Sequence, residues 1–341
     1  MTERPDHIID GDGHICERDD EIHPFLDPKF HDDGIRNFYF FPTLDGWMRG
    51  LGGSRGRPPM PHPDAEEYCR FLEDSGIAAS VIYPTAGLGY GFLKDKEWAR
   101  ELARGYNNFL YGRYLEESPR LKGVALIPVQ DPPSAARELR RAVKDLGAVG
   151  GLLPAVGLRI PYGDSAFDVL YEEAESLNVM LAIHGAPQQG LGFDFFDDSR
   201  ASGVLGHPFS QMVQFTSMVS AGVFARFPHL KVAFLEAGCG WVPFLLERLD
   251  DRFGGGAVTK QVRNSPLYFH AELDQASLPY VASVIGDDHL IYASDYPHEG
   301  VTADTAVDEL DTFFSRQDLS AETKVKMVGA NVEALYGLSG V

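Results

Sequence analysis

Eight short apolar, β-rich stretches recur along the chain, and their alternation with amphipathic stretches constrains the fold more than any other feature. The first stretch is IIDGDGHICE at residues 8–17, and the others lie at 78–85, 122–129, 148–155, 178–185, 230–237, 266–272 and 289–295. The stretches at 64–76, 97–117, 132–147 and 165–178 carry apolar residues at spacings of three and four, which is typical of amphipathic helices. Nearly continuous apolar strands joined by helices indicate a parallel sheet covered on both faces. Eight such units predict a (β/α)8 TIM barrel.

The chain has 341 residues, of which 44% are hydrophobic, so it can bury one large core. No repeat, linker or low-complexity tract divides it, and we expect a single barrel domain over residues 1–341. Two long connections, at about 15–62 after the first strand and about 185–208 after the fifth, have loop composition. Loops of that length in a compact domain often carry functional residues.

The formal charge of −20 argues against binding to nucleic acid or to an anionic membrane surface. An anionic substrate would therefore need a local cationic or metal-bearing pocket. The three cysteines are far apart and show no CxxC spacing, and no apolar run reaches the roughly 18 residues of a membrane span. We expect a soluble, cytoplasmic protein.

Polar side chains stand at the ends of several predicted strands, where a barrel places its chemistry. The first strand ends in Asp12 and His14, the fifth in His184, the sixth in Glu236 and the eighth in Asp295. Imidazoles and carboxylates that converge from different strands are the ligands that a divalent ion such as Zn²⁺ takes. For each residue alone, a hydrogen-bonded polar group at a sheet edge is the competing interpretation, but four strand ends together favour a metal site.

Four segments resemble the amidohydrolase superfamily, in its amidohydrolase-related, aminocarboxymuconate-semialdehyde-decarboxylase-like branch. They are IIDGDGHICE, LAIHGAP, VAFLEAGCGWVPFLLERLD and IYASDYPHEG, and the resemblance covers nearly the whole chain. It implies a metal-dependent enzyme on a TIM barrel.

The resemblance implies that Asp12, His14, His184 and Asp295 are the metal ligands. Asp12 stands where the superfamily's HxH pair has its first histidine, and a carboxylate there favours a harder ion such as Mn²⁺ somewhat relative to an all-histidine site. The bridging lysine of binuclear members is missing from the fourth strand, 148–155. We therefore expect one divalent ion, with zinc as the first expectation and manganese as the alternative.

Glu236 corresponds to the superfamily's usual histidine on the sixth strand. It could act as general acid or base, coordinate the ion, or pair with an arginine. His207 could line the pocket as a proton shuttle or lie at a helix start or on the surface. His298 could hydrogen-bond a ligand carboxylate, and Glu17 has no role that the spacing assigns.

The first functional hypothesis is non-oxidative decarboxylation of a small aromatic or unsaturated carboxylic acid, with Asp295 or Glu236 carrying the proton. The alternative is a hydrolase that uses metal-activated water on an amide, ester, lactone or C–C bond. A barrel without metal that only binds a ligand or assembles is a third possibility. The resemblance also implies a homodimer or larger homo-oligomer. A lid over an aromatic acid, or else a solvated loop, is expected from Phe38, Tyr39, Phe40, Trp47, Arg49, Arg55 and Arg57.

Overall fold

The computed structural model describes residues 4–31, 40–42, 60–185, 190–196, 199–298 and 300–338. Its strands form one sheet in the sequence order β1 to β8, and all neighbouring pairs are parallel. The strands are β1 (Ile9–Ile15), β2 (Ala79–Pro84), β3 (Leu121–Leu126), β4 (Gly150–Pro154), β5 (Met180–His184), β6 (Val232–Leu235), β7 (Leu267–His270) and β8 (Leu290–Ile291). The predicted TIM barrel is confirmed.

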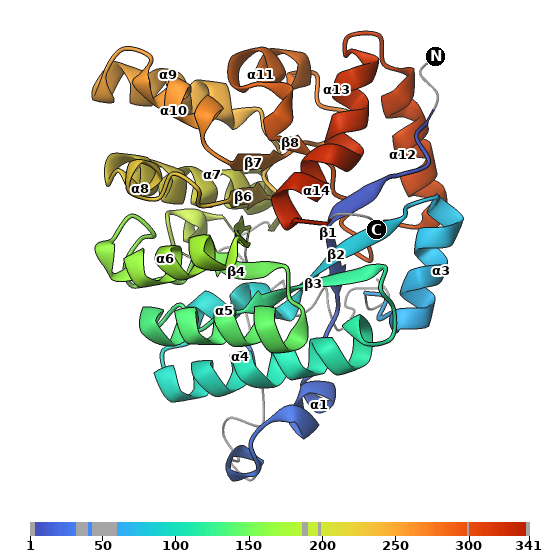
Figure 1. The fold of residues 1–341 in the computed structure, drawn as a ribbon, viewed down its shortest axis with the longest axis vertical. Helices are drawn as coiled ribbons and strands as arrows, with labels where there is room; N and C mark the ends of the chain where they lie inside the picture. Colours follow the sequence, from blue (N-terminus) through green and yellow to red (C-terminus); the bar gives the residue numbers. More distant parts are fainter. Residues whose placement is uncertain are drawn as a thin grey trace.

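Helices surround the strands on the outside of the barrel (Figure 1). The α-helices are α1 (Asp19–Ile22), α3 (Ala65–Ser75), α4 (Lys96–Leu110), α5 (Pro132–Leu146), α6 (Asp168–Leu177), α7 (Ser199–Ser220), α8 (Val223–Arg226), α9 (Trp241–Phe253), α10 (Ala257–Asn264), α11 (Leu278–Ile285), α12 (Ala303–Ser315), α13 (Ala321–Val325) and α14 (Asn331–Tyr336). Short 3-10 or π turns are η1 (His23–Phe25), η2 (Pro28–Phe30), η3 (Ala86–Phe92), η4 (Tyr111–Leu115), η5 (Ser165–Phe167), η6 (Phe193–Phe195), η7 (Asp287–His289) and η8 (Lys326–Ala330). The four predicted helical stretches correspond to α3, α4 with η4, α5, and η5 with α6.

Local sequence signals set where several helices begin and end. The side chain of Asp64 accepts a hydrogen bond from the backbone N–H of Glu67, and the side chain of Glu67 accepts one from the backbone N–H of Asp64, so α3 begins with a capping box. Gly76 ends the same helix at φ 69°, in the left-handed region that glycine enters without strain. The chain therefore turns sharply into β2.

The barrel closes between β1 and the residues that follow β8. Gly11 N donates to Tyr292 O at 3.0 Å, and Asp295 N donates to Asp12 O at 3.0 Å. The predicted eighth strand ran over 289–295, whereas β8 itself has two residues. Beyond it the backbone turns toward Asp10, whose carboxylate accepts hydrogen bonds from Ser294 N at 2.8 Å and Ser294 Oγ at 2.7 Å. This buried carboxylate replaces regular strand pairing at the closing seam.

Both long connections contain more helix than the sequence composition indicated. After β1, the described part holds α1, η1 and η2. The predicted loop at 185–208 is wrong for its second half, because α7 already begins at Ser199 and continues through Pro208. His207 is therefore a helix residue within α7 rather than a residue that follows a loop.

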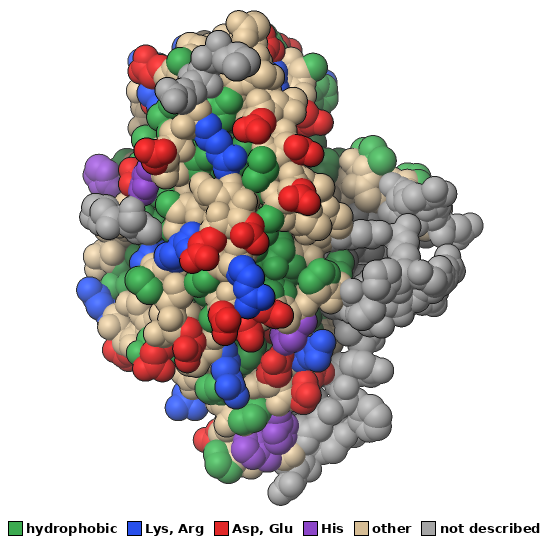
Figure 2. Space-filling model, turned by 90° about the vertical axis from the view of Figure 1, so that its right-hand side faces the viewer, with side chains coloured by type: hydrophobic (Ala, Val, Ile, Leu, Met, Phe, Trp, Pro, Cys, Tyr) green, Lys and Arg blue, Asp and Glu red, His purple; other side chains and the backbone are tan. Residues whose placement is uncertain are grey.

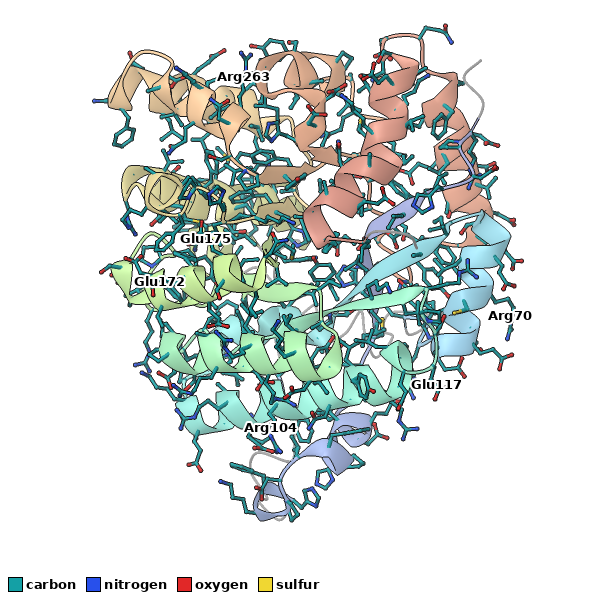
Figure 3. The ribbon with its side chains drawn as sticks, in the orientation of Figure 1. Arg70, Arg104, Glu117, Glu172, Glu175 and Arg263 are labelled. Carbon is teal, nitrogen blue, oxygen red and sulfur yellow. The ribbon has the colours of Figure 1, made fainter. Side chains whose placement is uncertain are left out.

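Charged side chains cover the outer helices. On the face shown in Figure 2, acidic and basic groups are interspersed among apolar and neutral ones rather than gathered in one patch of a single sign. Figure 3 places Arg70, Arg104 and Arg263 on α3, α4 and α10 of this outer layer. Among the helices that the structure describes, none is long and apolar enough to cross a membrane.

Candidate metal centre

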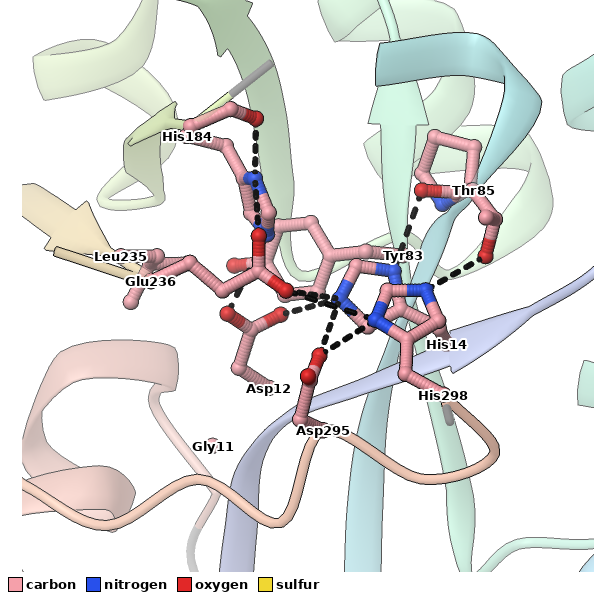
Figure 4. A network of polar contacts seen from close by, with 12 residues as sticks. Gly11, Asp12, His14, Tyr83, Thr85, His184, Leu235, Glu236, Asp295 and His298 are labelled. Carbon is pink, nitrogen blue, oxygen red and sulfur yellow. Dashed lines mark hydrogen bonds and ion pairs between the residues drawn. The ribbon is translucent and has the colours of Figure 1, made fainter. Parts of the chain in front are cut away.

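Polar side chains from different strands converge at the carboxyl-terminal mouth of the barrel (Figure 4). Asp12 and His14 lie in β1, His184 ends β5, and Glu236 directly follows β6. Asp295 lies four residues beyond β8, whose last residue is Ile291. The structure thus brings together all five residues that the strand ends singled out.

A first group consists of Asp12, His14 and His184. Asp12 Oδ2 lies 3.2 Å from His184 Nε2, and Asp12 Oδ1 lies 3.5 Å from His14 Nε2. All three side chains are almost completely buried. Their ligand atoms all lie within 4.8 Å of one another.

A second group shares His14 and adds Asp295, His298 and Glu236. Asp295 Oδ1 lies 3.3 Å from His14 Nε2 and 2.7 Å from His298 Nδ1. Glu236 Oε1 lies 3.4 Å from His298 Nδ1 and 3.7 Å from His14 Nε2. The His14 ring therefore lies where the two groups meet.

Several buried atoms in these groups form no hydrogen bond within the described part of the protein. They are Asp12 Oδ1, Asp12 Oδ2, His14 Nε2, His184 Nε2, Glu236 Oε2 and Asp295 Oδ1. Buried polar atoms without partners are costly, and their convergence is what a bound cation would offset. Two ligand atoms each about 2.1 Å from a tetrahedral ion lie about 3.4 Å apart, which is close to the separations seen here. The donor set therefore fits a divalent ion.

Backbone carbonyls orient the two buried imidazoles. His14 Nδ1 lies 3.1 Å from Pro84 O, and His184 Nδ1 lies 2.7 Å from Gly185 O. A carbonyl only accepts, so Nδ1 carries a hydrogen in each ring, and each ring presents the lone pair of Nε2 when it is neutral. Both Nε2 atoms face Asp12, as metal-binding histidines oriented by an outer partner do.

Glu236 and Asp295 both have left-handed backbone conformations, with φ of 55° and 59°. Non-glycine residues seldom adopt this region, and it is costly unless surrounding structure enforces it. In each case the turn comes just after the strand region, and the carboxylate points back over the barrel mouth (Figure 4). Strained carboxylates at this position are typical of a functional site.

Burial raises the pKa values of the carboxylic acids in the centre, whereas neighbouring imidazoles lower them. Burial raises the pKa of Asp12, and burial together with Glu236 raises the pKa of Asp295 well above its usual range. Burial would also raise the pKa of Glu236, but His184 and His207 outweigh it and hold that pKa well below the usual range. Glu236 is therefore ionised, whereas Asp295 resists ionisation in the absence of a cation.

Burial and the neighbouring charged groups also shift the pKa values of the histidines. Burial lowers the pKa of His184, but Asp12 and Glu236 overcome this and raise it to about 9. Burial also lowers the pKa of His298, but Asp295 outweighs this effect and raises that pKa well above the usual range. Burial and the neighbouring His298 lower the pKa of His14 well below normal. His14 is thus held neutral, the state in which imidazole binds a metal.

Glu236 has imidazole partners on several sides. His207 Nδ1 lies 3.2 Å from Glu236 Oε2 and 3.0 Å from Glu236 O, so α7 brings His207 directly against this residue. His270 Nδ1 accepts the backbone hydrogen of Glu236 at 3.2 Å. Within the described ranges no arginine pairs with Glu236.

Some contributors carried little sequence signal. Thr85, the residue after β2, places Oγ1 3.0 Å from His298 Nε2, but a threonine after a strand is too common to single out. For His298 the sequence indicated only a possible hydrogen bond to a ligand carboxylate, because this residue lies several positions beyond β8. Of the proposed lid, Phe40 is buried and packs against Trp98 with ring centroids 5.3 Å apart. The other proposed lid residues, Phe38, Tyr39, Trp47, Arg49, Arg55 and Arg57, lie outside the described residues.

Several known proteins are similar in sequence to this chain over most of its length. It is 25% identical over 291 residues to the gamma-resorcylate decarboxylase of Polaromonas sp. (strain JS666), covering 79% of this chain and 86% of that protein. It is also 25% identical over 267 residues to the 2-amino-3-carboxymuconate-6-semialdehyde decarboxylase of Dictyostelium discoideum, covering 75% of this chain and 72% of that protein. These relatives are decarboxylases.

Solved structures share the fold. The 5-carboxyvanillate decarboxylase of Sphingomonas paucimobilis superposes with a TM-score of 0.74 at 21% identity, covering 98% of this chain and 100% of that chain. A dihydroxybenzoic acid decarboxylase from Polaromonas sp. JS666, solved with manganese and the inhibitor 2-nitroresorcinol, superposes with a TM-score of 0.71 at 20% identity, covering 97% of each chain. The amidohydrolase family model matches residues 55–338, which is most of the sequence. The chain belongs to the amidohydrolase family.

Proposed function

We propose that this protein is a metal-dependent, non-oxidative decarboxylase of a small aromatic or unsaturated carboxylic acid. The observation that carries the proposal is the convergence, at the barrel mouth, of buried carboxylate and imidazole atoms that form no hydrogen bond within the described residues. The decarboxylase activity of the sequence relatives supports the choice of reaction.

Asp12, His14, His184 and Asp295 are the proposed ligands of one divalent ion. When bound, the ion would hold the substrate's carboxylate or a neighbouring hydroxyl and offset negative charge that develops during the reaction. Zinc and manganese both take imidazole and carboxylate ligands. The manganese bound in a structural relative supports manganese as an alternative to zinc. Elemental analysis of the purified protein distinguishes the two.

Decarboxylation breaks the bond between the substrate carbon and its carboxylate, releases CO2, and requires a proton at that carbon. Asp295 is the proposed carrier of this proton. Its side chain is 36% exposed against 11% for Glu236, and His298 holds it at 2.7 Å. Glu236, kept ionised by its imidazole partners, is proposed to hold His207 and His298 in position. Solvent then restores the proton to Asp295.

The test is release of CO2 from a panel of aromatic and unsaturated carboxylic acids by the metal-loaded protein. We expect turnover of at least one ortho-hydroxylated aromatic acid, and none by His184→Ala. Turnover of an ester, amide or lactone panel without CO2 from any acid would overturn the proposal in favour of metal-dependent hydrolysis.

A homodimer or larger homo-oligomer in the cytoplasm is also part of the proposal, carried by the family resemblance. Light scattering on the eluting peak of a sizing column measures the oligomer directly. A monomeric mass at micromolar concentration would overturn this part alone.

A further inference from the structure

The carboxylate of Glu17 clamps the residues that follow β2. Glu17 Oε2 accepts the backbone hydrogen of Thr85 at 2.9 Å, and Glu17 Oε1 accepts that of Gly87 at 2.7 Å. Glu17 and Thr85 are both buried. Burial raises the pKa of Glu17 to about 7, and when ionised this one carboxylate accepts both backbone hydrogens and fixes the turn more firmly than neutral partners would.

The clamped turn holds two imidazoles of the metal centre. Pro84 O lies 3.1 Å from His14 Nδ1, and the next residue, Thr85, places Oγ1 3.0 Å from His298 Nε2. The two rings stack with centroids 4.0 Å apart and planes inclined by 25°. Consecutive residues therefore orient a stacked pair of rings.

The opposite edges of both rings face one carboxylate oxygen. Asp295 Oδ1 lies 3.3 Å from His14 Nε2 and 2.7 Å from His298 Nδ1. The orientation of Asp295 thus depends on where the His298 ring is held. Because His298 Nε2 meets a hydroxyl, which can both donate and accept, the contact serves the ring in either protonation state.

We propose that Thr85 is a positioning residue, which acts through His298 on Asp295, and that Glu17 holds Thr85 in place. This inference rests on the proposed role of Asp295 as a metal ligand. It gives a role to Glu17, which sequence spacing alone left unassigned. Partners of this kind commonly change metal affinity by about 10- to 100-fold when removed.

The test compares Thr85→Val with Thr85→Ser, using the dissociation constant for Mn²⁺ or Zn²⁺ measured by competition with a chelator. Valine keeps the shape of the side chain but can neither donate nor accept, whereas serine keeps the hydroxyl. We expect the constant to rise at least about tenfold in Thr85→Val and to stay within about threefold of wild type in Thr85→Ser. Glu17→Gln, which retains one acceptor oxygen, should fall between them.

Thr323→Val is the matched control, because it removes another buried threonine hydroxyl, which donates to Asp287 at 2.7 Å away from the metal centre. It should leave metal affinity unchanged. Equal affinity in Thr85→Val and wild type, or equal loss in Thr85→Val and Thr85→Ser, would overturn the inference and leave the proposed function intact. Wild-type protein that binds neither ion would instead overturn the proposed function. Should Thr85→Val fail to fold, Glu17→Gln decides by the same measurement.

Discussion

At the scale of single residues, Asp12 is the feature that distinguishes this centre from one built on a histidine pair. Its two oxygens reach His184 Nε2 and His14 Nε2, yet neither forms a hydrogen bond within the part of the chain that the structure describes. A buried carboxylate without hydrogen bonds is costly to the fold unless a cation compensates it. In the metal-free protein the protonated ring of His184 supplies this cation, because Asp12 overcomes the effect of burial and helps raise the pKa of His184 to about 9.

The substitution Asp12→Asn should weaken metal binding more than about 100-fold, which exceeds the usual effect of losing an outer partner. The metal-free variant should melt below metal-free wild type, because it loses the buried charge pair between Asp12 and the protonated ring of His184. Asp288→Asn, which alters an exposed carboxylate before β8, is the matched control. Thermal unfolding with and without metal makes the comparison, and a metal-free Asp12→Asn protein that melts as high as metal-free wild type would contradict it.

The pH dependence of metal binding follows from His184. In the metal-free protein Asp12 and Glu236 overcome the effect of burial and raise its pKa to about 9, so an entering ion must displace a proton. Metal affinity should therefore rise about tenfold per pH unit below that value. A pH-independent dissociation constant between pH 6.5 and 8.5 would rule this out, and chelator competition at several pH values measures it.

The same shift predicts how the stability of the metal-free fold varies with pH. The pKa of His184 in the fold lies above its unfolded value of about 6.5. Its stabilising contribution is therefore complete below pH 6.5 and is lost as the pH rises to about 9. The raised pKa of His298 acts in the same direction. We expect the melting temperature of chelator-treated protein to fall across this window, and a flat or rising profile would contradict the assignment.

Much of the centre could be predicted from the sequence, because parallel strands of a barrel end at one face. This single rule was enough to bring Asp12, His14, His184 and Glu236 together. The rule could not reach Thr85, since a threonine after a strand is common and its contact with His298 depends on a turn conformation that no local pattern specifies.

At the scale of elements, helix α7 approaches the end of β5 so closely that only glycine fits at position 185. A Cβ on Gly185 would lie 2.5 Å from His207 Cγ. The substitution Gly185→Ala should therefore push His207 away from Glu236 and destabilise the fold by about 1 to 3 kcal/mol, as overpacking does. Gly112→Ala is the control, because a Cβ there makes only ordinary contacts with Phe25.

Urea unfolding measures the stability of both variants, and the CO2 assay measures their activity. We expect Gly185→Ala to lose activity at least about 100-fold, the lower end of what a positioned acid–base group contributes. Full activity in Gly185→Ala would show that the position of His207 against Glu236 is not needed.

Element boundaries were predicted less well than element types. All eight strands were expected, but the eighth is shorter because Asp10 and Ser294 replace regular pairing near the closing seam. The start of α7 at Ser199 was not expected, because the segment before Pro208 has the glycine and serine content of a loop. Contacts with the rest of the barrel determine whether such segments form helix or loop.

At the scale of the whole molecule, the charge of −20 opposes the approach of a carboxylic acid substrate. Salt screens such repulsion, since the Debye length falls from about 30 Å at 0.01 M to about 8 Å at 0.15 M ionic strength. We expect kcat/KM for an anionic acid to rise over this range of salt, chiefly through a lower KM. Sucrose at matched osmolality is the control, and a kcat/KM that falls with salt would indicate local positive steering instead.

The proposed function requires that the barrel mouth hold one divalent ion through Asp12, His14, His184 and Asp295. The most direct test is elemental analysis of wild type and His184→Ala after incubation with Mn²⁺ or Zn²⁺ and desalting. We expect about one equivalent of metal in wild type and less than about a tenth in His184→Ala, since a site of this kind needs its ligand set intact. Less than a tenth of an equivalent in wild type, or equal metal in both proteins, would contradict it.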